Sequence, residues 1–231
     1  MQLSGKRNIR AFLALAKANG YAIASRPNEL NIFGVRANKT TPNEFDDQLY
    51  TFWKDHKGVW KGRVYPITTD PGTYWLKNPM NVDGTAILKA GQYKNAYKLG
   101  LHRGEYEALV QTGPVTAIRD YDRNAILDFN NGKETTGLYG INIHRATKSG
   151  SSQNVDKWSA GCQVFQNSND FAEFIDLAKK HRDLYGNSFT YTLVDERAYT
   201  RKLKRYGAYV VGALLLGVSI YAIYRTLKKK K

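Results

Sequence analysis

Residues 140–165 read GINIHRATKSGSSQNVDKWSAGCQVF and contain the only cysteine of the 231-residue chain. Isoleucine alternates with Asn142 and His144 at the start of this stretch, which predicts a strand with a buried apolar face and an opposite polar face. A loop rich in glycine and serine follows at 147–154, and a second apolar strand begins directly after Cys162. The stretch therefore predicts two short strands joined by a long loop.

The residue types in this stretch suggest nucleophilic chemistry. Gly161 permits a tight turn that brings backbone N–H groups close to a substrate oxygen. A thiol becomes a nucleophile when an imidazole takes its proton, and the loop allows His144 to fold back beside Cys162. The alternative is purely structural, since a single cysteine is often a small buried side chain and a single histidine often has its hydrogen bonds satisfied within the fold.

The surrounding sequence predicts a mainly β domain with α-helix, of the α+β class. Short runs of β-branched and aromatic residues recur between turn residues. They predict strands at Asn31–Arg36, Leu49–Lys54, Val59–Thr68, Thr85–Ala90, Tyr106–Gln111, Val115–Arg119, Ala125–Phe129 and Gly140–Arg145.

One helix and one last strand follow Cys162. Asn169 or Asp170 is expected to cap the helix, and Gly186 is expected to end it. Phe189–Val194 is then expected to close the sheet. The predicted apolar face of the helix consists of Phe171, Phe174, Ile175 and Ala178.

Residues 1–66 are expected to form an N-terminal helix and a strand-rich accessory region, which either extends the sheet or forms a separate module. The helix is amphipathic, begins after Ser4 and ends at Asn19-Gly20. Its apolar run, residues 11–16, is too short for the hydrophobic region of a secretory signal. Its apolar face carries Ile9, Phe12, Leu13 and Ala16.

The C-terminal region predicts a membrane anchor. Residues 206–224 read YGAYVVGALLLGVSIYAIY without a charge, and about 19 helical residues span roughly 28 Å, close to a bilayer core. We expect a basic linker at 197–205, a transmembrane helix at 206–227 and a lysine tail at 228–231. The protein is thus expected to be a single-pass membrane protein, although basic residues on both flanks leave its orientation open. A buried core helix is the alternative.

The net charge of +15 belongs mainly to this C-terminal region. Ten of the 35 Lys and Arg residues and none of the 20 Asp and Glu residues lie from residue 197 on, which leaves +5 for residues 1–196. That modest excess, without a basic-aromatic motif, gives no reason to expect a nucleic-acid partner. One cysteine and four scattered histidines do not predict a metal site, and no cofactor is expected.

The segment from His144 to Cys162 resembles the signature of the L,D-transpeptidase (YkuD-like) catalytic domain. That signature has a histidine on a strand, a loop of similar length and then Ser/Thr-X-Gly-Cys, which here is Ser159-Ala160-Gly161-Cys162. The resemblance covers roughly residues 68–194 and implies a β-sandwich or barrel catalytic domain, which we expect at 67–196.

The resemblance implies a cysteine acyltransferase that acts on peptidoglycan stem peptides. Cys162 would attack a peptide carbonyl, and His144 would take the thiol proton and later protonate the leaving amine. The thioester would pass to an amine or to water, which makes the protein a transferase or a hydrolase. Backbone N–H groups around Ser159, Gly161 and Cys162 would hold the oxyanion. A backbone carbonyl after the histidine would orient the ring, and Asn142 is a candidate orienting residue.

Three residues next to Cys162 depart from the family pattern. Val164 stands where the family has Arg or Asn, Ala160 where a polar residue is common, and Gln163 where an apolar residue is usual. The nucleophile and base are unchanged, but the expected cation for a substrate carboxylate is missing. Arg145 is a candidate replacement, with a solvated surface arginine as the alternative.

Other polar side chains carry weaker signals. His56 and the group from His102 to Glu105 are expected on the solvated surface, and His181 is expected as a cation near a helix C-terminus. A bacterial or phage-encoded cell-wall enzyme fits the absence of a secretory signal together with the predicted anchor. The competing functions are a catalytically silent wall-binding or structural protein held at the membrane and, more weakly, a nucleic-acid binder.

Overall fold

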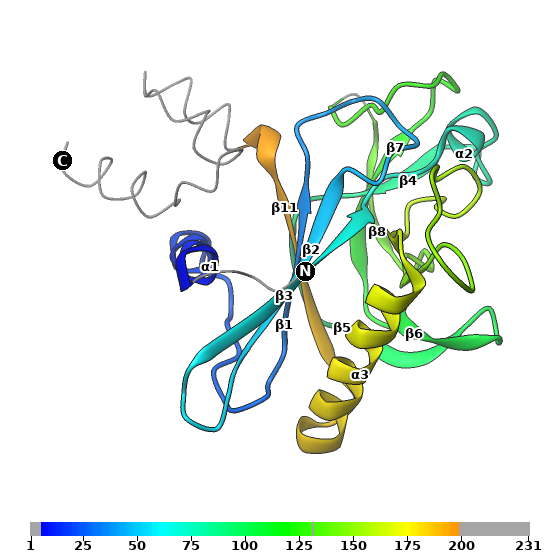
Figure 1. The fold of residues 1–231 in the computed structure, drawn as a ribbon. Coiled ribbons are helices and arrows are strands. Elements are labelled where there is room, and N and C mark those ends of the chain that lie inside the picture. The colour runs from blue at the N-terminus through cyan, green and yellow to red at the C-terminus, as the bar shows by residue number, and fades with distance from the viewer. Residues whose placement is uncertain (1–5, 131, 199–231) are drawn as a thin grey trace, which may run out of the picture.

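The computed structural model of the chain describes residues 6–130 and 132–198 (Figure 1). The described part is mixed α and β with mostly strands, which confirms the expected α+β class at that level. The elements in chain order are α1 (Lys6–Asn19), β1 (Asn31–Arg36), β2 (Asp47–Lys54), β3 (Trp60–Thr68), α2 (Thr73–Lys77), β4 (Thr85–Leu88), β5 (Gly91–His102), β6 (Tyr106–Gln111), β7 (Val115–Asp120), β8 (Glu134–Gly137), β9 (Ile143–Arg145), β10 (Gln163–Phe165), α3 (Ser168–Tyr185) and β11 (Phe189–Asp195).

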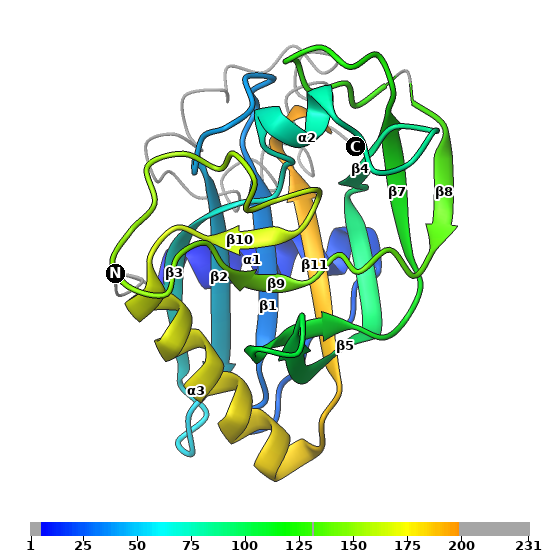
Figure 2. The same ribbon diagram turned by 90° about the vertical axis from the view of Figure 1, so that its right-hand side faces the viewer.

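Eight strands form a closed barrel in the order β1-β11-β5-β6-β9-β10-β3-β2, and β4, β7 and β8 form a separate three-stranded sheet. Two neighbouring pairs in the barrel are parallel, β1 with β11 and β9 with β10. Figure 2 shows β9 and β10 side by side across the barrel, with β7 and β8 to one side of it. The last strand lies between β1 and β5 and so closes the sheet, as predicted.

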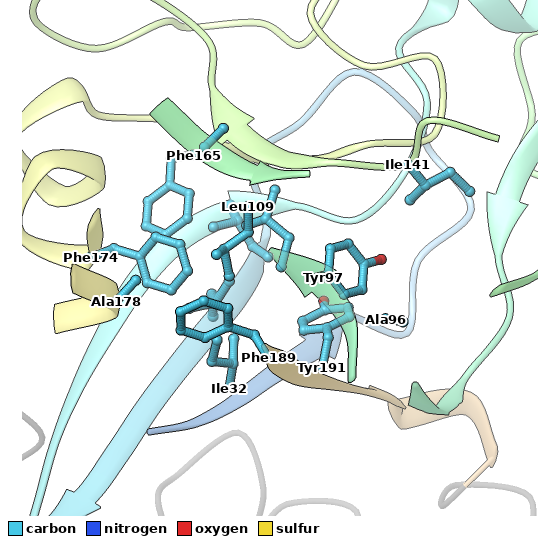
Figure 3. Close-up of a cluster of buried hydrophobic side chains, with 14 of the residues drawn as sticks. Ile32, Ala96, Tyr97, Leu109, Ile141, Phe165, Phe174, Ala178, Phe189 and Tyr191 are labelled. Carbon is cyan, nitrogen blue, oxygen red and sulfur yellow. The ribbon is translucent and has the colours of Figure 1, made fainter. Parts of the chain in front are cut away.

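The main core fills the barrel with aromatic and aliphatic side chains. Tyr97 and Tyr191 pack edge to face with ring centroids 5.9 Å apart, and α3 adds Phe174 against Phe165 at 5.0 Å (Figure 3). The predicted apolar face of α3 is buried in this core. Close packing of such rings excludes water from the space behind β9 and β10.

Helix α1 covers the outside of the barrel on a different side from α3 (Figures 1 and 2). Phe12 contacts Phe33 of β1 and Phe52 of β2, with ring centroids 5.2 and 5.8 Å apart. Ile9 and Ala16 are buried beside it, as the helical spacing predicted. Strand β1 is therefore buried on both faces, with Ile32 in the main core and Phe33 under the helix.

The cap of α3 lies earlier than the sequence predicted. Asn167, and neither Asn169 nor Asp170, is the N-cap, and its side chain accepts hydrogen bonds from the backbone N–H groups of those two residues at 2.8 and 3.2 Å. The predicted end of the helix is confirmed, since Gly186 is the C-cap with φ of 89°.

We expect Asn167→Ala to lower the free energy of unfolding by about 1 kcal/mol, because two backbone N–H groups of the first turn lose their acceptor. The matched control is Asn169→Ala, which removes an exposed amide that caps nothing and should change stability by less than about 0.5 kcal/mol. Urea unfolding followed by circular dichroism measures both. Equal losses in the two variants would contradict the assignment of the cap.

Several predicted strand positions were wrong. Ala125–Phe129 forms no strand, because its N–H groups bond to loop oxygens such as Thr40 O. The strand predicted from Gly140 begins only at Ile143. The long strand β5 was not predicted, since Gly91, Asn95 and Gly100 read as turn residues; Asn95 has φ of 53° and lies where the pairing with β11 changes register. Strand β8 and the short helix α2 were also missed.

Residues on both sides of the expected domain boundary share one barrel. The boundary after residue 66 falls inside β3, and β1, β2 and β3 pair with β11 and β10 from the other side of it. Two alternatives were open for residues 21–66, and β1, β2 and β3 agree with the first of them, an extension of the sheet.

A buried arginine ties the small sheet to the barrel. Arg36 of β1 is 1% exposed and donates hydrogen bonds to Leu88 O of β4 and to Thr69 O, both within 3.0 Å. Its guanidinium lies 2.8 Å from the Asp70 carboxylate. These bonds fix β4 against the end of β3, and β4 borders the turn that precedes Cys162.

The predicted membrane helix at 206–227 lies outside the described residues, as do Ser4, the lysine tail and most of the basic linker. Within residues 6–130 and 132–198, no helix has the length and apolar character needed to cross a bilayer.

Candidate functional site

The barrel brings together the strand of His144 and the segment of Cys162. In the parallel pair β9–β10, Val164 lies opposite His144 and Gln163 lies opposite Ile143. The Gln163 N–H continues this pairing by donating to Asn142 O at 2.9 Å. Cys162 directly precedes β10 and so lies alongside Asn142. The segment of Cys162 therefore neighbours the strand that carries His144.

The turn before Cys162 is held by Ser159. The buried Ser159 hydroxyl donates to Cys162 O at 2.9 Å and accepts from the Gly161 N–H at 3.1 Å. Gly161 has φ of +118°, and a Cβ there would lie 2.2 Å from Ala86 O of β4. The turn therefore needs glycine for both its conformation and its close approach to β4.

This arrangement leaves fewer of the expected N–H groups to hold an oxyanion. The sequence suggested N–H groups around Ser159, Gly161 and Cys162, but the Gly161 N–H is already bonded to the Ser159 hydroxyl. Among the described residues, the Cys162 N–H has no acceptor. Of the backbone N–H groups of Gly161, Cys162 and Gln163, it is the one that stays available to a substrate oxygen in the described part of the chain.

His144 is buried, with 3% of its surface exposed, and its tautomer follows from its partners. Nδ1 lies 2.9 Å from Arg145 O, the carbonyl of the next residue, and a carbonyl only accepts, so Nδ1 carries the proton. Nε2 then carries the lone pair and has no hydrogen-bond partner in the described residues. Burial and the nearby His102 lower the pKa of His144 to about 3, which keeps the ring neutral at ordinary pH.

Cys162 is half-buried and protonated at rest. Its thiol donates a weak hydrogen bond to Gly140 O at a distance of 3.4 Å between Sγ and the oxygen. Burial raises the pKa of the thiol to about 11, although the Asn142 backbone and the charge of Arg103 oppose this shift. The resting pair thus consists of a neutral thiol and a neutral imidazole, without a hydrogen bond between them.

Asn142 orients a different imidazole from the one expected. Its side-chain oxygen accepts from the Gln111 N–H at 2.8 Å, which turns its NH₂ toward His102 Nδ1 at 3.1 Å. The expectation that His102 lies on the solvated surface was wrong, since it is 7% exposed and stacks on His144 with ring centroids 4.1 Å apart. Nothing in the sequence around His102 indicates a contact with β9, so this partner was not predicted.

A cavity of about 280 Å³ opens beside the two imidazoles. Tyr106 and Trp158 contribute aromatic walls, and Glu105 is the one acidic residue among the described residues that line the cavity. Four basic side chains line it: Arg103, Arg145, Lys148 and Lys157. The excess of cations suits an anionic ligand.

Arg145, the candidate for carboxylate binding, is fixed in this wall. Its guanidinium stacks over the Tyr106 ring at 4.2 Å and donates to Thr147 O at 3.2 Å. Val164 and Gln163, which depart from the family pattern, are buried in the barrel instead of facing the cavity. Gln163 accepts from the Tyr191 hydroxyl at 2.8 Å and donates to Gly161 O, so it supports the turn from the core side.

The other sequence candidates do not join this site. His56 is exposed, as expected, and contacts Asn28. His181 is buried, and both ring nitrogens are bonded, to the Leu30 N–H and to Ser188 O; its expected role as a helix-end cation was wrong because burial lowers its pKa. It borders a larger cavity of about 570 Å³ between β1, β11 and the end of α3. Within the described ranges, no cluster of His, Cys, Asp and Glu has a geometry that could hold a metal ion.

Comparisons with known proteins add no relative to this picture. No protein-family model matches the chain, and neither the curated proteins nor the solved structures give a significant match.

Proposed function

We propose that this protein is a cysteine acyltransferase that acts on peptidoglycan stem peptides through a thioester on Cys162. The observation that carries the proposal is the tautomer of His144. The Arg145 carbonyl holds the proton on Nδ1, so Nε2 can act as a base and has no hydrogen-bond partner among the described residues. His144 lies on the strand beside the Cys162 segment. A backbone carbonyl after the histidine is also what the resemblance to L,D-transpeptidases implies.

The proposed reaction starts from neutral partners. The thiol leaves Gly140 O and gives its proton to His144 Nε2 as sulfur attacks the substrate carbonyl, and the imidazolium then protonates the leaving amine. Because the pKa values of His144 and Cys162 lie near 3 and 11, a resting ion pair is disfavoured. Proton transfer is therefore expected only as the sulfur attacks an electrophile, which in the proposed reaction is the substrate carbonyl.

The cavity supports a substrate that carries carboxylates. Four cations and one acid line it, and Arg145 is held in place by Tyr106. Stem peptides end in carboxylates, which arginine can bind with two parallel hydrogen bonds. We propose that Arg145 supplies the cation for the substrate carboxylate, which Val164 cannot supply. The acceptor of the acyl group, an amine or water, stays open in this proposal.

Membrane attachment is a second part of the proposal. The uncharged stretch 206–224, with basic residues on both flanks, would hold the barrel at a bilayer as a single-pass anchor. Such a tethered enzyme suits a bacterial or phage protein that remodels the cell wall.

A catalytically silent wall-binding protein is the second candidate, favoured by one observation, the resting thiol that bonds to Gly140 O and not to His144. Incubation of the full-length chain with purified sacculi, followed by mass analysis of muropeptides, decides between the two. The enzyme produces new cross-links or shortened stems that are absent with Cys162→Ala. Retention on sacculi with unchanged muropeptides would support the silent protein.

A further inference from the structure

A second imidazole lies against the candidate base. His102, at the end of β5, stacks on His144 with an interplanar angle of 21° and lies 5.5 Å from the Tyr106 ring, centroid to centroid. His102 also lines the cavity of about 280 Å³, but the proposed proton transfer runs between Cys162 and His144 and does not use the His102 ring. The stacking contact points to a role that acts through His144.

The hydrogen-bond network fixes the protonation of His102. Because the Asn142 oxygen accepts from the Gln111 N–H, the Asn142 NH₂ points at His102 Nδ1, which must accept and hence carries no proton. Burial and the charge of Arg103 both lower the pKa of His102. Protonation of His102 at Nδ1 would set its N–H against the Asn142 NH₂, with the two nitrogens 3.1 Å apart. It would also place a cation against His144.

The titratable and charged groups around His102 do not reverse this preference. His144 of β9 and Tyr106 of β6 contact the ring, and Arg103 and Glu105 lie in the turn after β5. Glu105 opposes Arg103, but both side chains are exposed, and burial is the largest cause of the lowered pKa of His102. Arg145, Lys148 and Lys157 add positive charge around the same cavity.

We propose that His102 is a positioning residue whose neutral ring supports the imidazolium of His144, and whose protonation switches off the Cys162–His144 pair in acid. This proposal rests on the proposed function. A neutral π face stabilises a cation stacked on it, whereas a second cation at the same distance repels it. Acid inactivation would then follow the titration of His102 and not that of His144.

The test is the pH dependence of alkylation by iodoacetamide in the full-length chain. The reaction forms a bond between Cys162 sulfur and carbon, iodide leaves, and the thiol proton passes to His144. Because the chain has one cysteine, the label reports this site alone. The variants are His102→Phe, which keeps a stacked ring, and His102→Gln, which keeps an acceptor for Asn142; neither titrates.

For the unmodified protein we expect the rate to fall in acid with a midpoint below about 6.5, the ordinary pKa of histidine. Both variants should move this midpoint at least about one pH unit lower, and His102→Gln should also react about 5-fold more slowly at neutral pH because it lacks the ring. A purely structural role would lower the rate by the same factor at every pH. An unchanged midpoint in both variants would overturn the proposal.

Two further measurements separate this proposal from the proposed function. His144→Ala should slow alkylation at every pH, and if it does not, the proposed function fails whatever His102 does. The NMR titration of the His102 ring in the unmodified protein should have the same midpoint as the loss of alkylation. A mismatch between those midpoints overturns the role of His102, even if its variants fail to fold.

Discussion

Replacing Cys162 by serine should reduce the rate of muropeptide conversion at least about 10³-fold, the largest effect expected in this protein. Serine keeps the size of the side chain, but its hydroxyl is a far weaker acid and a poorer nucleophile than the thiol. A thioester cannot form, so the acyl group has no carrier. Conversion of purified sacculi, followed by mass analysis of the products over time, measures the loss.

His144→Ala should cause a loss of similar size, because His144 Nε2 is the proposed base for the Cys162 thiol. The two losses should not add in the double variant, since both residues act in the same step. His56→Ala is the matched control, because this exposed histidine bonds to Asn28, away from the candidate site, and its loss should leave the rate unchanged. A Cys162→Ser protein that retained a tenth of the activity would contradict the proposed function.

Gly161→Ala should lower the free energy of unfolding by about 3 kcal/mol or more. Two costs combine, because φ of +118° is strained for a side chain and the new Cβ would lie 2.2 Å from Ala86 O. That carbonyl cannot retreat easily, since β4 is paired with β7 and fixed by Arg36. Chemical denaturation monitored by fluorescence gives the change in free energy.

Gly150→Ala is the matched control for Gly161→Ala. Gly150 also has positive φ, +70°, but a Cβ there meets nothing within 4 Å. The expected cost is therefore only the backbone term of about 1 kcal/mol. If the two variants lost equal stability, the contact with β4 would not be what requires glycine at position 161.

The parts of the fold that the sequence predicted are those with local patterns. Strand β1 was predicted with correct bounds, and the apolar face of α3 follows directly from its 3.6-residue period. Strand β5 was not predicted, because its bulge at Asn95 and its glycines break the alternation that marks a strand. The strand pairs with β6, which follows directly after a short turn, and with β11, which is distant in sequence.

The same distinction applies to the candidate site. The alternation around Ile143 placed Asn142 and His144 on one strand, and the glycine before Cys162 indicated a turn. Neither pattern shows which side chain a distant strand supplies. The contact of His102 with Asn142 and His144 depends on the path of β5 around the barrel, so only the three-dimensional arrangement reveals it.

The closure of the barrel by its first and last strands has a consequence for biosynthesis. Ile32 of β1 pairs with Tyr191 of β11, 159 residues later in the chain. While a ribosome makes the protein, the edges of β1 and β5 that β11 later covers remain unpaired until the last strand has emerged. Exposed edges of this kind attract other chains, so the nascent protein should depend on chaperones more than its size suggests, and it should fold slowly once released.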